Sequence, residues 1–213
     1  MTIALVNPNT SQATTDAMVA IARGALPAAP VTGFTAPFGA PLISNEEALA
    51  VAADAVLSID YGAVEGLEGV IVAAFGDPGL EALSQKLSVP VVGIAQSGML
   101  AAAEGGRWFS VVTTTPDLVK AIEKRAASYG IGPQLASVRL TDGNLMETMA
   151  DPELLVSRLA AAIDNAIRLD GAEAILIGGG PLAVAARTLA DRVSVPLIEP
   201  VPEAARRLAK MLS

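Results

Sequence analysis

Short apolar segments alternate along the chain with longer, alanine-rich segments that carry polar residues at helical spacing. This alternation predicts repeated βαβ units. Most of these short segments are continuous apolar runs, which is typical of parallel strands buried on both faces. The predicted strands are Ile3–Val6, Val31–Thr35, Gly69–Ala74, Val89–Ile94, Phe109–Val112, Ala136–Thr141, Ala174–Gly178 and Val195–Ile198.

Several helix starts are marked by polar residues at capping positions. Ser44 and Glu47 have the spacing of a capping box. Three further starts combine an N-cap residue with a proline at the first helical position, namely Asp77-Pro78, Thr115-Pro116 and Asp151-Pro152. The helices are therefore expected to follow the strands closely.

The first half of the chain matches the second half when the sequence is shifted against itself by 106 residues. The matched segments are Ile3–Asn7 with Phe109–Thr113, Val31–Thr35 with Ser137–Thr141, Ser88–Val91 with Ser194–Leu197 and, with one residue less of offset, Val70–Ala74 with Ile175–Gly179. Because the matches follow one another in order, they predict an internal duplication of a half-domain.

The predicted fold is α/β, with two pseudo-symmetric, doubly wound parallel-sheet halves and an active-site cleft between them. We expect one half to comprise residues 1–98 plus 200–213 and the other to comprise residues 99–199. Ligands of open parallel sheets bind beyond the carboxyl ends of the strands. The matched pairs Asn7 with Thr113 and Ala74 with Gly179 are therefore expected to line the cleft.

Composition favours a small-molecule partner. The 213 residues are 52% hydrophobic and carry a net charge of −8 without a dense Lys/Arg cluster, which argues against nucleic acid and anionic membranes. No apolar stretch approaches the roughly 18 residues of a membrane span, and no basic region opens the chain. We therefore expect a cytoplasmic protein, and its abundant Ala and Val favour a homo-oligomer.

The chain contains neither cysteine nor histidine. Disulfides, thiolate nucleophiles and the usual near-neutral acid/base are therefore excluded. We expect no metal site, since only scattered carboxylates remain as ligands. We also expect no nucleotide, because Gly178-Gly179-Gly180-Pro181 lacks the spacing of a dinucleotide loop.

Three motifs lie at the ends of predicted strands: Val6-Asn7-Pro8-Asn9-Thr10-Ser11, Ala73-Ala74-Phe75-Gly76-Asp77-Pro78-Gly79-Leu80 and Ile175-Leu176-Ile177-Gly178-Gly179. They resemble the hydantoin and allantoin racemases of the aspartate/glutamate racemase superfamily, and the resemblance spans nearly the whole chain. It implies a cofactor-free isomerase with one cysteine from each half. One thiolate would take the proton from the stereocentre, and the opposite thiol would return one to the other face.

The sequence departs from this family at both cysteine positions, where the resemblance aligns Ala74 and Gly179. A methyl group and a hydrogen atom cannot transfer a proton, so the two-thiol mechanism is excluded for this chain. A related type, arylmalonate decarboxylase, uses one cysteine and a glycine at the other position. This chain has neither thiol and lacks that acid as well.

Three functions stay open. The first is a cysteine-independent, cofactor-free enzyme that isomerises, opens or eliminates from a small cyclic amide, such as a hydantoin or lactam, or a small carboxylate. The second is a non-catalytic protein that binds such a molecule. The third is a racemase variant from which the thiols were removed.

Two carboxylates are candidate acid/base groups. Asp77 is the nearest carboxylate to Ala74 and could act as a base or orient a water, although the structural interpretation makes it the N-cap of a helix that begins at Pro78. Glu47 is explained by the capping box, whereas Glu46 has no such role and is the second candidate.

Hydroxyl and amide groups just beyond the strands are candidate substrate contacts, since such groups suit a carboxylate or a ring carbonyl. Helix capping is the alternative interpretation for those around the first strand and its repeat. The candidates with such side chains are Asn7, Asn9, Thr10, Ser11, Gln96, Ser97, Thr113 and Thr114. Phe75 and Gly180 are further candidates for substrate contact.

Overall fold

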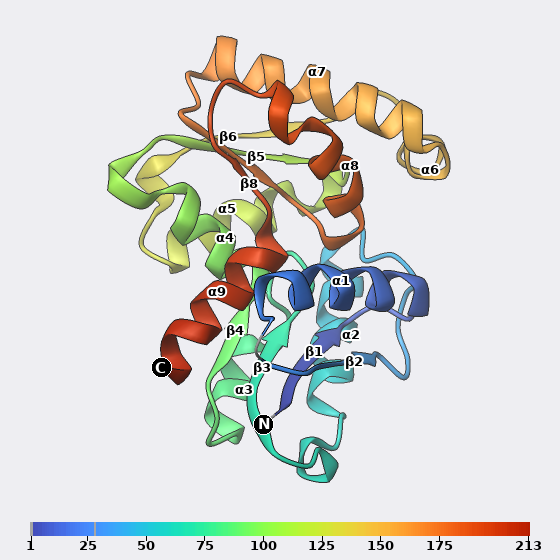
Figure 1. The fold of residues 1–213 in the computed structure, drawn as a ribbon. Coiled ribbons are helices and arrows are strands. Elements are labelled where there is room, and N and C mark those ends of the chain that lie inside the picture. Colours follow the sequence, from blue (N-terminus) through green and yellow to red (C-terminus); the bar gives the residue numbers. More distant parts are fainter. Residues whose placement is uncertain (1, 28) are drawn as a thin grey trace. The chain divides into compact units, whose positions relative to one another are not determined.

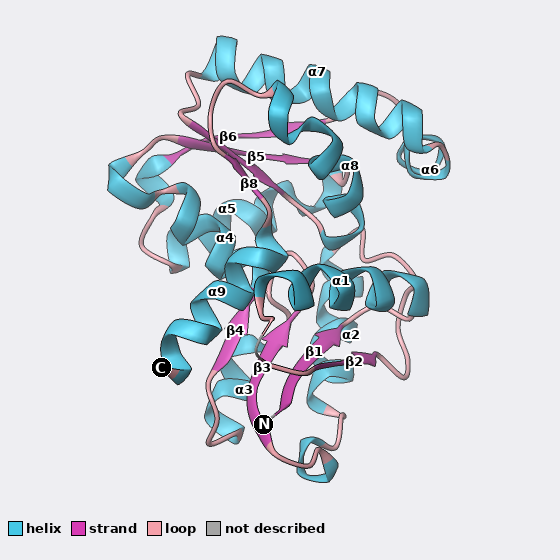
Figure 2. Cartoon of the chain, viewed as in Figure 1, coloured by secondary structure: helices cyan, strands magenta, loops and turns pink. Residues whose placement is uncertain are grey.

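The protein is described by a computed structural model that covers residues 2–27 and 29–213. The chain divides into two compact units. The first unit comprises the chain up to Ser97 together with Val201–Ser213, and the second comprises Gly98–Pro200. Each unit contains a four-stranded parallel sheet accompanied by helices (Figure 1; Figure 2).

The sheet of the first unit has the strand order β2-β1-β3-β4, and all neighbouring strands are parallel. Its strands are β1 (Thr2–Asn7), β2 (Val31–Thr35), β3 (Leu67–Val72) and β4 (Val91–Gly93). The accompanying helices are α1 (Gln12–Ala25), α2 (Glu46–Leu57), the 3-10 turn η1 (Tyr61–Ala63), α3 (Leu80–Lys86), the start of α4 (Ile94–Ala102) and α9 (Pro200–Leu212).

Helices cover both faces of this sheet. On one face, Ala4 and Val6 of β1 belong to a buried cluster with Val56 of α2 and Leu83 of α3. On the other face, two glycines allow close helix packing. A Cβ atom at Gly33 would lie 2.7 Å from Val19 Cγ2 of α1, and one at Gly69 would lie 2.8 Å from Leu208 Cδ1 of α9.

The sheet of the second unit has the order β6-β5-β7-β8, again entirely parallel. Its strands are β5 (Phe109–Thr113), β6 (Leu135–Leu140), β7 (Ala174–Ile177) and β8 (Leu197–Ile198). Its α-helices are the end of α4, α5 (Val119–Ser128), α6 (Leu145–Ala150), α7 (Pro152–Asp170) and α8 (Ala183–Leu189). Its 3-10 turns are η2 (Glu104–Gly106), η3 (Pro116–Leu118), η4 (Gly132–Gln134), η5 (Gly180–Leu182) and η6 (Ala190–Arg192).

The core of the second unit is built mainly between β7 and the helices α7 and α8. Ile175 and Ile177 of β7 belong to one buried cluster with Leu159 of α7 and Leu189 of α8. Leu176, between the two isoleucines, points to the other face, where α4 packs closely because Gly98 has no side chain. A Cβ atom there would lie 2.6 Å from Leu176 Cδ1.

The two units have the same strand order, and one backbone hydrogen bond between neighbouring strands is repeated in both. Their sheets have matching strand orders. Beyond the third strand of each unit, the Ala73 N–H donates to the Val6 carbonyl and the Gly178 N–H donates to the Val112 carbonyl, both at 2.8 Å. The predicted α/β fold with two pseudo-symmetric parallel-sheet halves is therefore confirmed.

The predicted helix starts were only partly correct. Asp151 caps α7 as expected, because its carboxylate accepts two backbone N–H bonds of the first turn. The capping box at Ser44 was wrong by one residue, since Asn45 is the N-cap of α2 and its amide oxygen accepts from the Ala48 N–H at 2.8 Å. Pro116 begins a 3-10 turn, and the Thr115 side chain does not cap it.

An ion pair joins the edge strand β6 to the end of α7. The Arg139 guanidinium donates two hydrogen bonds to the Asp170 carboxylate, one of them from Nε at 2.6 Å. Ser137 donates a further bond at 2.6 Å to the same carboxylate, and Ser137 also pairs with Ser110 of β5 at 2.8 Å. The hydrogen bond from Arg139 lowers the pKa of Asp170 below its ordinary value.

We predict that Asp170→Asn lowers the free energy of unfolding at pH 7. A carboxyl with a depressed folded-state pKa contributes stability above its unfolded pKa of about 4, and this contribution is lost as the pH falls through the folded value. The deficit of the variant, measured by urea denaturation, should therefore shrink below pH ~4. Asp164→Asn is the control, because Asp164 is 56% exposed in its pair with Arg168 and should matter little. Equal stability of Asp170→Asn and the unchanged protein at pH 7 would contradict the prediction.

Candidate functional site

Ala74 and Gly179 occupy equivalent places in their units. Strand β3 ends at Val72 and strand β7 ends at Ile177, so each of the two residues lies two positions beyond its strand. Both are half-buried. The registers of the sheets support this equivalence, because β1 pairs Val6 with Val72 as β5 pairs Val112 with Ile177.

The two adjacent glycines of the second unit have different surroundings. Gly179 has φ 169°, an extended conformation open to any residue, and an added Cβ would lie 3.5 Å from Leu182 Cγ in ordinary contact. At Gly178 an added Cβ would lie 2.8 Å from Val111 Cγ1 and 3.0 Å from Thr113 Cβ. Position 179 therefore has room for a side chain, whereas position 178 requires glycine.

The side chain of Asn7 organises the loop after β1. Asn7 is fully buried, and its Nδ2 lies 2.8 Å from Asn9 Oδ1, 3.0 Å from the Ser11 carbonyl and 3.0 Å from Thr15 Oγ1. Its Oδ1 accepts from the Asn9 N–H at 3.1 Å. These contacts use the Asn7 amide within the loop itself.

Among the other polar residues of this loop, Asn9 and Ser11 form hydrogen bonds within the loop, whereas the Thr10 hydroxyl is available. Asn9 Oδ1 accepts from the Ser11 N–H at 2.9 Å, and Ser11 Oγ accepts from the Thr14 N–H at 3.3 Å as the N-cap of α1. Thr10 is half-buried, and among the described residues its hydroxyl has no hydrogen-bond partner. Of the four predicted contacts in this loop, Thr10 has the side chain most available to a ligand.

Threonines take the corresponding place after β5. Thr113 Oγ1 donates to the Gly178 carbonyl at 3.0 Å and pairs with Thr115 Oγ1 at 3.1 Å. Thr114 is buried, and its Oγ1 lies 3.9 Å from Met149 Sδ. Thr113 thereby ties the end of β5 to the loop that leads to Gly179 and to the buried Gly180.

The prediction that Asp77 caps a helix beginning at Pro78 was wrong. Helix α3 begins only at Leu80, and its N-cap is Gly79 in a left-handed conformation without a side-chain cap. The chain instead turns at Asp77, where φ is 49° and the carbonyl accepts from the Leu80 N–H at 3.2 Å.

Asp77 caps a different helix through space. Its Oδ1 accepts from the Ala95 N–H at 2.8 Å and its Oδ2 accepts from the Gln96 N–H at 2.6 Å, at the start of α4. The residue is fully buried. A carboxylate placed against helix N–H groups is stabilised by the helix dipole, so the geometry supports a capping role rather than that of a solvent-accessible base.

Gly93 makes this contact possible, and this role of Gly93 was not predicted from the sequence. A Cβ atom at Gly93 would lie 2.2 Å from the Asp77 carboxyl carbon. The two residues are 16 positions apart in the chain. A glycine at the end of a strand was the only signal in the sequence, and it does not identify the partner.

The remaining predicted site residues belong to the first unit. Glu46 and Glu47 are exposed in the first turn of α2. Phe75 is buried, Gln96 is half-buried, and the buried hydroxyl of Ser97 has no hydrogen-bond partner among the described residues. Asp77, Gln96 and Ser97 are thus brought together at the first turn of α4.

The described residues contain neither a metal-ligand cluster nor a membrane-spanning helix. Within residues 2–27 and 29–213, no three His, Cys, Asp or Glu side chains are grouped so that they could hold a metal ion. In the same part of the chain, no helix combines the length and the apolar character needed to cross a membrane.

Comparison with known proteins gives a consistent result over nearly the whole chain. Residues 3–208 match the family model of Asp/Glu/Hydantoin racemase. The chain is 31% identical to a hydantoin racemase from Paenarthrobacter aurescens over 216 residues, which cover 100% of this chain and 91% of the relative. The chain belongs to the Asp/Glu/Hydantoin racemase family.

Solved structures of this family have the same fold. An allantoin racemase from Pseudomonas fluorescens superposes with a TM-score of 0.93 at 31% identity, covering 100% of this chain and 91% of that one. An allantoin racemase from Klebsiella pneumoniae gives a TM-score of 0.92 at 30% identity, covering 100% and 87%. Arylmalonate decarboxylase, at 18% identity and a TM-score of 0.63 over 100% of this chain and 93% of that one, shares the fold alone.

We predict that Gly178→Ala and Gly179→Ala have different effects on stability. Forcing a methyl group against Val111 and Thr113 should lower the free energy of unfolding by about 1–3 kcal/mol. Gly179→Ala should cause little change or a small gain, because its backbone already suits a non-glycine residue. Urea denaturation of both variants measures the difference, and equal stabilities would refute the assignment of the close contact to position 178.

We predict that Asp77→Asn destabilises the first unit by roughly 1.5–3 kcal/mol, the usual contribution of hydrogen bonds to a charged group. Asparagine replaces one of the two acceptor oxygens by an NH2 donor, so one of the Ala95 and Gln96 N–H groups would face a donor in place of an acceptor. Amide hydrogen exchange should show faster exchange at these two positions. Glu47→Gln is the matched control, because Glu47 is exposed in the first turn of α2. In this variant, hydrogen exchange of the α4 amides should stay unchanged.

Proposed function

We propose that this member of the racemase family binds a small cyclic amide of the hydantoin type, or a small carboxylate, and that it carries no two-thiol proton relay. The observation that carries the proposal is that Ala74 and Gly179 lie at equivalent places beyond β3 and β7 in a chain without cysteine. The family fold is kept while both expected thiol positions lack a titratable atom.

The ligand class follows from the relatives and from the available groups. The most similar proteins described above are named as hydantoin and allantoin racemases. A cyclic amide presents both N–H donors and carbonyl acceptors, which hydroxyls, side-chain amides and backbone groups can match without changing protonation. The Thr10 hydroxyl and the half-buried Gln96 amide are the side chains that we expect to make such contacts.

The surroundings of the two predicted acid/base residues favour binding over turnover. General acid–base catalysis needs a titratable atom within hydrogen-bond reach of the reacting centre. The Asp77 carboxylate is buried and bonded to the backbone of α4. Of the two predicted acid/base residues, only Glu46 is exposed, so a cysteine-independent enzyme would depend on Glu46.

We predict that calorimetric titration with hydantoin, allantoin and a small dicarboxylate detects saturable binding to at least one of them. Incubation of the bound compound, followed by mass and optical rotation, should show neither a product nor a change of configuration. Thr10→Val should weaken the binding, because it removes a hydroxyl at nearly constant volume. A product that forms with the unchanged protein and disappears with Glu46→Gln would overturn the proposal in favour of the cysteine-independent enzyme.

We predict that the double variant Ala74→Cys/Gly179→Cys gains measurable incorporation of solvent deuterium at the stereocentre of a hydantoin. The extended backbone at Gly179 accepts the new side chain without strain. Each single variant should be far less active, because residues that act as a unit are strongly non-additive. The control Ala74→Ser/Gly179→Ser matches the size but has no readily ionised group. A folded double-cysteine variant that binds the compound without exchange would contradict the assignment of the thiol positions.

A further inference from the structure

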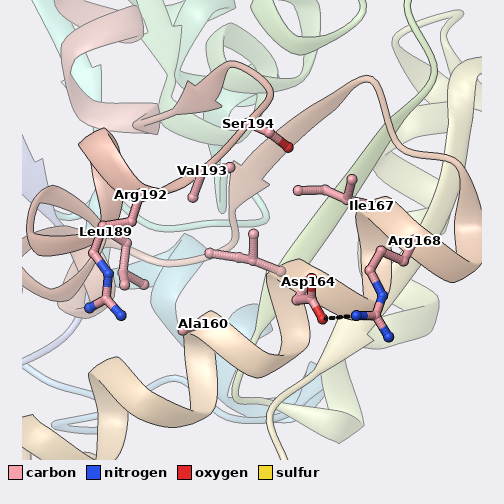
Figure 3. A pocket seen from close by; sticks show the side chains of 9 residues that line it. Ala160, Asp164, Ile167, Arg168, Leu189, Arg192, Val193 and Ser194 are labelled. Atoms are coloured by element: carbon pink, nitrogen blue, oxygen red, sulfur yellow. Dashed lines mark ion pairs between the residues drawn. The ribbon is translucent and has the colours of Figure 1, made fainter.

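The second unit contains a hollow of about 270 Å³ that includes none of the residues discussed above as ligand contacts. Figure 3 shows α7 side chains along one side of it and residues of the segment after α8 along the other. Its lining residues are Ala160, Ile163, Asp164, Ile167, Arg168, Leu189, Arg192, Val193 and Ser194.

The wall contributed by α7 is one stripe of that helix. The lining positions of α7 recur at intervals of three and four residues, the spacing of a single helical face. Ile163 and Leu189 are 3% and 1% exposed and belong to the core, so the inner wall is firmly packed. The hollow is therefore apolar inside and bounded by fixed elements.

The rim carries an uncompensated positive charge. Arg168 is paired with Asp164 at 3.3 Å, as the dashed line in Figure 3 marks. Arg192, at the end of η6, is exposed and forms no ion pair with any residue in the described part of the chain. This local excess of positive charge is notable in a chain with 14 basic and 22 acidic residues.

We propose that this hollow binds a small organic anion with an apolar body, such as a monocarboxylate of about the size of benzoate. The apolar body lies against Ile163, Ile167 and Leu189, and the carboxylate accepts hydrogen bonds from the Arg192 guanidinium. The forked donors of an arginine match the two oxygens of a carboxylate. The volume lies just below the roughly 300–1,000 Å³ of drug-sized ligand sites, which suits a compact ligand.

The anion is the better ligand for this hollow than a neutral molecule or a cation. An apolar neutral compound would leave the Arg192 guanidinium without a new partner. A cation would find only Asp164, whose carboxylate is already paired with Arg168. The apolar walls supply contact area, and Arg192 selects the charge of the ligand.

The test is a titration of the full chain with benzoate, in which backbone amide chemical shifts are monitored by NMR spectroscopy. We expect saturable shifts at residues 160–168 and 189–194, with a dissociation constant in the millimolar range that is typical of so small a ligand. Benzamide, which has the same shape without the charge, should bind at least about 5-fold more weakly. Shifts confined to other residues, or equal affinity for both compounds, would overturn the proposal.

Two variants separate the contributions of charge and volume. Arg192→Gln should weaken benzoate binding at least about 5-fold, whereas Arg187→Gln should leave it unchanged, because Arg187 pairs with Glu199 outside the hollow. Ala160→Phe should abolish binding by filling the hollow without changing the charge. Unchanged benzoate affinity in Arg192→Gln, or in a folded Ala160→Phe variant, would refute the site.

The hollow is separate from the groups that we expect to contact a cyclic amide. The lining residues and the expected contacts with a cyclic amide share no member. If hydantoin does not bind, the benzoate-induced shifts at residues 160–168 should still be observed. Benzoate binding that fails would leave the Thr10→Val experiment unaffected.

Discussion

A buried carboxylate determines how the first unit is arranged beyond its strands. Asp77 accepts the Ala95 and Gln96 N–H groups, so the turn after β3 and the start of α4 are held together. This arrangement requires glycine at position 93 and a left-handed backbone at Asp77. A buried charge without such partners would be strongly unfavourable, so the turn that carries Ala74 and the helix that carries Ser97 form one structural group.

The second unit repeats a backbone hydrogen bond of the first unit and differs in the polar side chains nearby. The Ala73 and Gly178 N–H groups make the same bond to the neighbouring strand in their respective units. Where Asn7 organises the loop of the first unit, Thr113 reaches the Gly178 carbonyl in the second. Backbone hydrogen bonds of a parallel sheet tolerate many side chains, so duplicated halves can diverge in their polar groups while the fold persists.

The same separation of backbone and side chain bears on the chemistry of the family. Catalytic function depends on particular side chains placed on a fold, and the fold alone does not supply it. At Gly179 the loop geometry has room for a side chain that this sequence does not provide. The family fold is thus retained in a chain whose proton-transfer groups must differ from a pair of thiols or be absent.

Much of the fold was determined by the sequence itself. The continuous apolar runs located the strands, and the ordered self-match at 106 residues identified two related halves, because buried strand positions constrain residue type strongly. The sequence located the ends of strands and helices less accurately. β8 spans only Leu197–Ile198, and the capping residue of α2 proved to be Asn45, since neighbouring polar residues offer almost equal local signals.

Only the tertiary structure decided the partners of the polar groups. Nothing local distinguishes an Asp77 that caps the next helix in sequence from one that caps α4 through space. The hollow beside α7 likewise depends on two separate segments of the chain, residues 160–168 and residues 189–194. Periodicity records whether a residue is buried, whereas the identity of its neighbours emerges only when separate elements pack together.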